Sequence, residues 1–471
     1  MNLAWLLAPA LAGAMTFSSR AATPPSFVVL VGEGQGWSSL SVPMDDSNPR
    51  SPSADVRTPH LDRLAREGMR FSRFLAASPR CTPSRAALLT GRSPAQLHMT
   101  FVREGRGDDP GAPTRLVPAS STNELPLDAT TVAEVLRPLG YATAHFGKWH
   151  LGRTDPSRHG FDASSGPTSN GGPDNSEHPN PTQAFACADA AVAFIRSNVA
   201  KGRPFYVQVC QYAGKSVLDA RPETYAAAEQ RLGPRGRMRA GAVAVAEDAD
   251  AAQGRILQAL DQLGVATNTF VFYTTDHGAP GRNPPLSGGK GTLGEGGLRV
   301  PLLVRGPGIP PGRSSPTFAT MVDLLPTVAD LAHADVSGIR GIEGGSLVPA
   351  FRDPDHGIVR RLRESFVVHF PHYDKDPLGP ASALYQGDFK LVRRHEDGAL
   401  QLFNLARDPS ESRDLARDQP VQAADLDQRL AAYLKDVGAA MPAMRDVSGP
   451  VTRAQDLPGE RRGKRARPAR P

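Results

Sequence analysis

Cys81 and Arg85 are the residues whose types and spacing most directly suggest chemistry. They frame the run Cys81-Thr82-Pro83-Ser84-Arg85, at the start of a predicted helix. One helical turn separates the two side chains and places them on the same side of that helix. The dipole and the free N–H groups of a helix start favour anions. The pair therefore predicts a thiol and a guanidinium held together where an anion can bind.

Further polar residues follow predicted strands or lie in a glycine-rich loop. Lys148 and His150 lie two positions apart at a strand end, so both side chains point to one face. Asp276 and His277 follow a later strand, and Lys290 lies in the glycine-rich loop beyond it. Ligands of open parallel sheets bind beyond the carboxyl ends of the strands. These side chains are therefore expected to share one site.

The elements that must position these residues alternate between strand and helix. The expected strands cover 27–31, 141–146, 205–209, 269–273 and 300–304. The expected helices cover 83–90, 129–138, 183–199, 239–263 and 321–333. A further helix is expected to begin at Pro59, with Thr58 as its N-cap. This alternation predicts an α/β fold, in which helices cover both faces of a large, mostly parallel sheet.

The pattern changes after about residue 345, where the expected elements become short. The expected strands of this part are 365–370, 382–386, 389–394 and 400–404. They predict an antiparallel sheet, followed by a helix near 420–436. We therefore expect a catalytic domain over 23–344 and a smaller C-terminal antiparallel α+β domain over 345–440. The Pro-rich segment 441–471 has no apolar periodicity and is expected to be a basic, disordered tail.

The positive charge of the chain is concentrated in that tail. The formal net charge is +6 over 471 residues, and residues 461–470 contain six Lys or Arg and no acid. The rest of the chain is therefore formally neutral. This placement gives little support to nucleic-acid binding, and no nucleic-acid partner is expected.

The N-terminal residues 1–22 have the pattern of a signal peptide. An apolar run from Leu3 to Met15 precedes small residues, with cleavage expected near Ala21 or Ala22. The run is too short for a transmembrane helix, and no later segment is apolar enough to span a bilayer. We therefore expect an exported protein, periplasmic or extracellular. A buried N-terminal helix is the alternative interpretation.

The chain has three cysteines, an odd number for an exported protein. If Cys81 is reserved for chemistry, Cys187 and Cys210 remain. They either form a disulfide or stay as two buried thiols, and we favour the thiols.

The run around Cys81 resembles the signature of the sulfatase family. That signature is Cys, any residue, Pro, any residue, Arg, followed by Thr-Gly-Arg, here Thr90-Gly91-Arg92. Further segments similar to the family are 58–65, 146–152, 274–278, Lys290, 295–301, 387–391 and 402–405. The resemblance implies an alkaline-phosphatase-like fold and a formylglycine-dependent sulfuric ester hydrolase.

The resemblance also implies a role for each polar residue named above. Cys81 is expected to be oxidised to formylglycine by a maturase, and Arg85 to neutralise the oxyanion of the oxidised residue. Lys148 is expected to contact the formylglycine oxygen, and His150 to help deprotonate its hydrate. Lys290 is expected to bind sulfate and assist the leaving oxygen. The alternatives are a structural thiol, a packed histidine and a solvated lysine.

A divalent metal is implied by the same resemblance, with calcium as the usual ion and magnesium as the alternative. Asp276 and His277 resemble the second pair of metal ligands, and modified residue 81 adds another. Where the family has two aspartates as the first pair, this chain has Glu33-Gly34. Glu33 replaces one carboxylate, whereas Gly34 offers only its backbone, so weaker metal affinity is expected.

Two sets of residues are candidates to complete the site. Asp45 and Asp46 either fold back towards the metal or are exposed loop acids, and the second interpretation is favoured. The family's sulfate-contacting histidine after the strand at 205–209 is missing here. Tyr212 or Lys215 is expected to replace it as a donor, unless the site is degraded.

His369 and His372 form an unusual cluster after a strand of the second domain. They either line the substrate pocket or lie on the surface.

The sequence therefore predicts a hydrolase that releases sulfate from an organic ester. The expected substrate is a sulfated small molecule or polysaccharide, with a carbohydrate favoured. The alternatives are a weakened sulfatase-like protein that binds sulfated glycans and a phosphoester or phosphonate hydrolase of the same fold.

Overall fold

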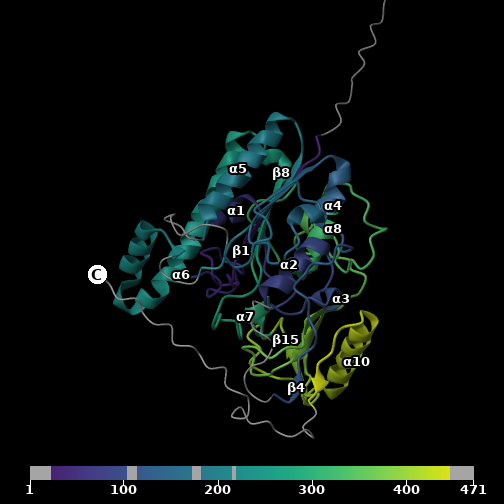
Figure 1. Ribbon diagram of the computed structural model, residues 1–471. Coiled ribbons are helices and arrows are strands. Elements are labelled where there is room, and N and C mark those ends of the chain that lie inside the picture. Colours follow the sequence, from purple (N-terminus) through teal and green to yellow (C-terminus); the bar gives the residue numbers. More distant parts are fainter. Residues whose placement is uncertain (1–22, 103–113, 172–181, 215–218, 446–471) are drawn as a thin grey trace, which may run out of the picture.

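An eight-stranded sheet forms the centre of the computed structural model, which describes residues 23–102, 114–171, 182–214 and 219–445 (Figure 1). The strands follow the order β10 (Arg313–Ser315), β2 (Met69–Phe71), β9 (Leu302–Arg305), β8 (Thr269–Thr275), β1 (Ser26–Gly32), β7 (Phe205–Cys210), β5 (Ala142–Gly147) and β6 (Ala163–Ser164). The five strands from β8 to β6 are parallel, and β9 is antiparallel to its neighbours. This confirms the expected α/β class.

The central strand β1 explains why its sequence is continuously apolar. Phe27, Val29 and Val31 belong to the core on one face of the sheet. Val28 and Leu30 belong to the core on the other face. Since successive side chains of a strand point to opposite faces, a strand covered on both sides must be apolar at every position.

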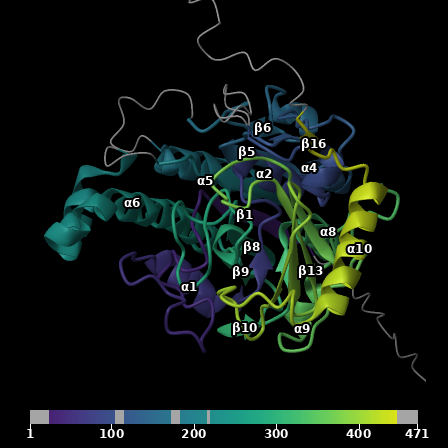
Figure 2. The same ribbon diagram turned by 90° about the horizontal axis from the view of Figure 1, so that it is seen from below.

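Helices cover the two faces, as Figure 2 shows from below. The face that carries Val28 and Leu30 is covered by α1 (Pro59–Glu67), α5 (Ala184–Ala200) and the C-terminal half of α6 (Pro222–Gln262). The face that carries Phe27 and Val29 is covered by α2 (Cys81–Thr90), α4 (Val132–Leu136), α8 (Leu324–Leu331) and α9 (Val348–Arg352). Short helices α3 (Pro94–Leu97) and α7 (Glu295–Leu298) lie in the connections.

Helix α6 is much longer than the predicted helix over 239–263. It begins at Pro222 and is interrupted by Gly233, whose φ of 65° is left-handed, and by Pro234. Gly and Pro break the helical pattern, and so the sequence shows only the part beyond the interruption. In Figure 1 the N-terminal part of α6 extends away from the sheet, at the left.

The C-terminal part forms a second, antiparallel sheet. Its strands are β12 (Phe366–Phe370), β13 (Ala381–Gln386), β14 (Phe389–Arg394) and β15 (Leu400–Asn404). One face packs on α10 (Pro420–Asp436) in a small core of its own. The other face, with Val368 and Tyr385, belongs to the core of the large sheet. The second sheet is therefore joined to the first by shared apolar packing.

All three cysteines are buried free thiols, as we favoured for Cys187 and Cys210. Burial raises the pKa of Cys187 to about 12, which suits an inert thiol.

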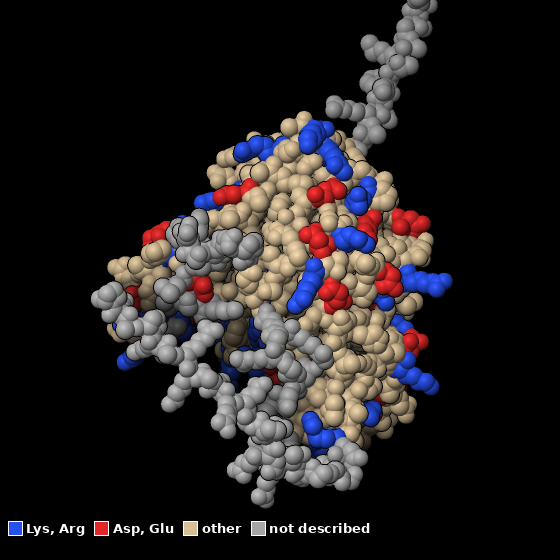
Figure 3. Space-filling view, viewed as in Figure 1, with Lys and Arg blue, Asp and Glu red and all other residues tan. Residues whose placement is uncertain are grey.

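Among the described residues, no helix has the length and apolarity needed to cross a bilayer. Export remains a prediction, since the expected leader lies outside the described residues. In Figure 3, positive and negative side chains are interspersed over the visible face.

The start of α1 is capped by another helix. The predicted cap residue, Thr58, makes no side-chain cap, and its hydroxyl lies 2.7 Å from that of Ser41. Instead, Asp250 of α6 accepts hydrogen bonds from the N–H groups of His60 (3.1 Å) and Leu61 (2.9 Å). Thr58 is therefore the N-cap residue, as predicted, but its side chain does not cap the helix, and the acceptor that does so lies almost 190 positions away.

Burial raises the pKa of Asp250 to about 7, even though the two N–H donors lower it. Its unfolded value is about 3.9, so the folded state binds the proton more tightly. The stability contributed by this group is therefore present below about pH 4 and is lost as the pH rises through about 7. Asp250→Asn cannot ionise. Between pH 5 and 8, we expect its unfolding free energy to gain about 1–2 kcal/mol relative to the parent.

Urea unfolding at several pH values measures this difference. Asp189→Asn is the matched control, because Asp189 is an exposed acid that pairs with Arg255 on the same face of the sheet. The assignment is contradicted if the difference in unfolding free energy between Asp250→Asn and the parent stays constant with pH. It is also contradicted if Asp189→Asn shows the same change with pH.

Candidate active site

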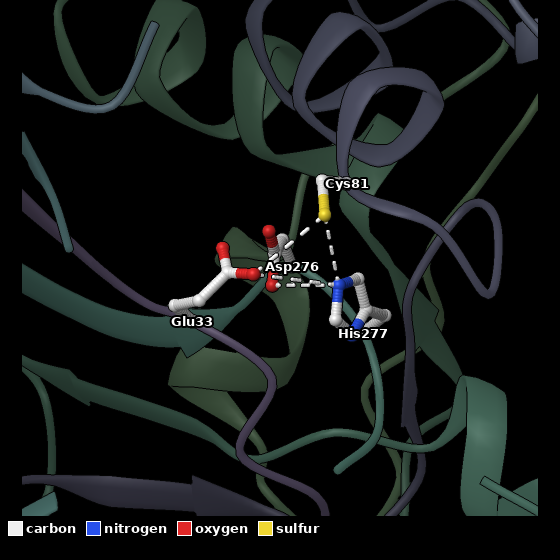
Figure 4. Close-up of side chains that lie close together, drawn as sticks. All are labelled: Glu33, Cys81, Asp276 and His277. Atoms are coloured by element: carbon white, nitrogen blue, oxygen red, sulfur yellow. Dashed lines mark hydrogen bonds and ion pairs between the residues drawn. The ribbon is translucent and has the colours of Figure 1, made fainter. Parts of the chain in front are cut away.

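Side chains from two strand ends and one helix start meet beyond the carboxyl edge of the large sheet. Glu33 follows β1, Asp276 and His277 follow β8, and Cys81 is the first residue of α2. Figure 4 shows their functional groups pointing towards one another. The strand pairing makes this meeting unavoidable, because β1 and β8 are parallel neighbours that end level with each other.

These four residues form a compact donor cluster. Cys81 Sγ lies 3.1 Å from His277 Nε2 and 3.6 Å from Glu33 Oε1. His277 Nε2 lies 3.5 Å from Asp276 Oδ1. One ligand atom from each residue falls within 4.8 Å of all the others. Two carboxylates, an imidazole and the atom at position 81 are thus arranged as a divalent metal requires, with oxygen donors in the majority once residue 81 carries oxygen.

Three cations surround the carboxylates of the cluster. Lys148 Nζ lies 2.7 Å from Glu33 Oε2. Arg85 Nη2 lies 3.1 Å from the same oxygen and 3.0 Å from Asp276 Oδ2. Lys290 Nζ lies 3.5 Å from Glu33 Oε1 and 3.7 Å from Cys81 Sγ. The cations are therefore paired with carboxylates, yet close enough to attract an anion at position 81.

The charges around Cys81 favour its ionised form. Burial and the Glu33 carboxylate raise the pKa of the Cys81 thiol. Lys148, His277 and a hydrogen bond from His150 lower it, and the balance leaves the pKa well below its usual value. Burial also raises the pKa of Glu33, but the adjacent cations hold it well below the ordinary range. The pocket is thus built to stabilise negative charge where residue 81 reacts.

His150 also lies beside residue 81. It is buried and adopts a left-handed backbone conformation with φ 59°. Its carbonyl accepts a hydrogen bond of 2.9 Å from the Thr82 hydroxyl, beside Cys81. A strained backbone at such a site is held by its surroundings, here by α2. The geometry therefore places an imidazole next to residue 81, as a proton acceptor must be.

Gly34 contacts the cluster through its backbone N–H, which donates to Asp276 Oδ1 at 3.1 Å. Its φ of 56° is left-handed, and a Cβ there would lie 3.2 Å from His277 Cε1. Glycine therefore allows the imidazole to approach. Asp46 pairs with Arg70 at 2.6 Å, so it is a loop acid outside the cluster.

Tyr212 lines a cavity of about 580 Å³ together with Glu33 and Lys290. Burial raises its pKa to about 12, partly offset by the hydroxyl of Thr168, so it is a neutral donor. Its position is compatible with contact to a bound anion. Lys215, the other candidate, lies outside the described residues.

The two C-terminal histidines lie elsewhere, and the expectation that they bind substrate or lie on the surface needs correction. His369 is buried, with Nδ1 2.6 Å from Ser382 Oγ and Nε2 donating to the Ala440 carbonyl at 2.9 Å. His372 is buried with Nε2 2.8 Å from Thr100 Oγ1. Neither is among the described residues that line the cavities beside the cluster. Both are interior packing residues.

The sequence did not reveal how the C-terminal sheet holds the site. Arg80, next to the nucleophile position, donates to Asp374 Oδ2 at 2.5 Å. Gly291, next to Lys290, donates its N–H to the carbonyl of Pro79 at 3.0 Å. These contacts join the segments that carry residue 81 and Lys290 to each other and to the second sheet.

A second set of contacts holds the end of the Lys290 loop. Asp376 Oδ2 accepts the N–H of Leu293 at 2.8 Å. Lys390, fully buried on β14, donates to the Leu293 carbonyl and to Glu411 Oε1, both at 2.6 Å, and lies 3.3 Å from Glu295 Oε1. Lys390 and Glu295 lay in segments noted for resemblance, whereas Asp374 and Asp376 have no local sequence signal.

Comparison with protein families finds two matches. The family model described as Sulfatase matches residues 25–334. The model described as N-sulphoglucosamine sulphohydrolase, C-terminal, matches residues 289–439.

Curated relatives agree with these matches. Steryl-sulfatase of Mus musculus is 33% identical over 440 residues, which cover 74% of this chain and 67% of the relative. N-acetylgalactosamine-6-sulfatase of Canis lupus familiaris is 33% identical over 387 residues, with 74% and 69% covered. A sulfatase of Formosa agariphila is 27% identical and covers 91% of this chain and 92% of its own.

Solved structures share the fold. Ps i-CgsB, in complex with k-i-k-neocarrahexaose, has a TM-score of 0.72 and 25% identity, and covers 88% of this chain and 93% of its own. The phosphonate monoester hydrolase of Agrobacterium radiobacter has a TM-score of 0.64 and 18% identity, with 89% and 99% covered. The second likeness concerns the fold alone.

Asp376→Ala should lower turnover of a sulfate ester, because it frees the end of the loop that carries Lys290. Misplacing a reacting group by about 1 Å costs up to about 100-fold, and we expect a loss of 10- to 100-fold in kcat with a smaller change in KM. Steady-state kinetics measure this. Asp388→Ala is the control, since Asp388 makes a half-exposed pair with Arg73. Parent-like kcat in Asp376→Ala contradicts the positioning role.

Proposed function

Because this chain belongs to the sulfatase family and is a sulfatase, we propose that it hydrolyses sulfate esters through a formylglycine at position 81 and a divalent metal. The observation that carries the proposal is the position of Cys81 Sγ, between the donor cluster and Lys290. Oxidised to formylglycine, residue 81 supplies a hydrated aldehyde whose one hydroxyl attacks sulfur while the other allows sulfate to be expelled.

The residues of the chain would share the remaining tasks. Arg85 and Lys148, both buried, offset the negative charge that develops on residue 81. His150, beside residue 81, accepts the proton of the second hydroxyl as sulfate is released. Lys290 binds the sulfate and donates a proton to the leaving oxygen. Since each group acts from a fixed, buried position, little reorganisation is needed during the reaction.

The residues present fit a divalent metal. Glu33, Asp276, His277 and residue 81 would hold it, and calcium or magnesium suits their oxygen donors. Such an ion supplies a Lewis acid for the sulfate oxygens and the nucleophile. The absence of a side chain at Gly34 supports weaker binding than a site with four acidic or imidazole ligands.

We further propose that the protein is exported after its residue 81 is oxidised by a formylglycine-generating maturase. The signal-peptide pattern of residues 1–22 supports export. Deep burial of Cys81 supports oxidation before folding is complete, because an enzyme could not reach the finished site.

The first prediction of this proposal concerns residue 81. After co-expression with a competent maturase, mass spectrometry of the peptide spanning Cys81 should show formylglycine. Cys81→Ala should lose turnover completely while its unfolding transition stays close to that of the parent. Cys187→Ala is the control, since this inert buried thiol should be dispensable for turnover. A fully active enzyme whose Cys81 is unmodified would exclude the formylglycine mechanism.

The second prediction concerns the metal. Asp276→Ala removes a carboxylate from the cluster, so calcium affinity measured by calorimetry should fall more than about 10-fold. Asp46→Ala removes an acid outside the cluster and should keep the affinity of the parent. Equal calcium binding by Asp276→Ala and the parent would exclude Asp276 from the site.

A further inference from the structure

The cavity of about 580 Å³ opens directly onto the reacting residues. Glu33, Gly34 and Lys290 form its inner end, and Lys290 Nζ lies 3.7 Å from Cys81 Sγ. Its volume is within the range of cavities that enclose small organic ligands. A ligand in this cavity is therefore continuous with the reaction centre.

The described wall of this cavity is largely apolar. Ala242, Val245, Ala246 and Ala249 of α6 lie along it at helical spacing. Apart from Glu33 and Lys290, no described lining residue carries a formal charge. The neighbouring residues Val243 and Ala244 belong to a small core, the half-buried Val245 packs partly against it, and Ala242 is exposed. Among the described residues, the α6 face towards the cavity is thus only partly covered.

A second cavity beside the site has a different character. This cavity, of about 720 Å³, is lined by His150 and by polar residues that include Asn123, Glu124 and Arg153. In the proposed reaction His150 acts on residue 81, whereas Lys290 acts on the leaving oxygen. The alcohol must therefore depart on the Lys290 side, where the α6 wall is apolar and the uncharged polar lining residues are Gln35, Thr182, Gln211 and Tyr212.

We infer that the apolar cavity binds the alcohol part of the substrate and that this part is uncharged and largely apolar, an alkyl or aryl group. This inference rests on the proposed function. A sugar placed against the α6 wall would bury hydroxyl groups without partners, which costs about 1–3 kcal/mol each. Ring carbons placed there gain about 0.8 kcal/mol per buried CH₂. The cavity therefore favours the apolar ester over the sulfated carbohydrate expected from the sequence, and the names of the curated relatives include both a steryl-sulfatase and an N-acetylgalactosamine-6-sulfatase.

Two esters of equal ring size and similar leaving-group chemistry test this: cyclohexylmethyl sulfate and methyl glucoside 6-sulfate. Both are sulfates of primary alcohols. In the matured enzyme, kcat/KM should be at least about 10-fold higher for the cyclohexylmethyl ester. Calorimetry with Cys81→Ala, which needs no maturation, should likewise show tighter binding of the cyclohexylmethyl ester than of the glucoside ester. An equal or reversed preference in both measurements overturns the inference and leaves the sulfatase function intact.

Ala242→Asn and Val245→Asn place an amide on the α6 wall. Each should lower the preference for the cyclohexylmethyl ester by about 3- to 10-fold, through a weaker affinity for that ester alone. Val421→Asn, at an exposed position of α10, is the matched control. An unchanged preference between the two esters in both cavity variants also overturns the inference. Because residue 242 is exposed, Ala242→Asn should keep the fold. If the matured enzyme cleaves neither ester but Cys81→Ala binds the apolar one, the proposed function fails while the binding site stands.

Discussion

The Glu33 carboxylate balances the buried charge on which the site depends. Buried cations without partners are very costly, and Arg85 and Lys148 are almost fully inaccessible to water. Glu33 accepts contacts from both of them and from Lys290, while it also faces residue 81. Glu33, with Asp276 as a second partner of Arg85, therefore allows three cations to gather where an anionic ester must react.

The parallel sheet explains how such a crowded site can be assembled. Neighbouring strands β5, β7, β1 and β8 all end at one edge, and the chain leaves each with a polar residue. Helix α2 directs its N-terminus at the same point, so the backbone adds favourable charge for an anion. Strand register sets the position of Glu33 relative to Asp276, and the helix sets that of Arg85 relative to residue 81.

The second sheet contributes stability and precision to this arrangement. Its inner face shares the core of the large sheet, so the two parts bury apolar surface together. Its polar residues Asp374, Asp376 and Lys390 hold the segments before residue 81 and after Lys290. The loop that carries Lys290 is thus fixed at both ends by contacts to other parts of the chain.

By itself, the sequence determined the α/β class, five strands of the large sheet and the candidate residues around Cys81, because these depend on local periodicity and on motifs. It missed the short strands β2, β6 and β10. Cys81 and Arg85 are one helical turn apart, and so their proximity follows from spacing alone. Only the tertiary structure decided that Asp250 caps α1, that His369 and His372 are interior, and that α6 forms the apolar cavity wall. These features join residues far apart in the chain, where no local pattern records which side chains will meet.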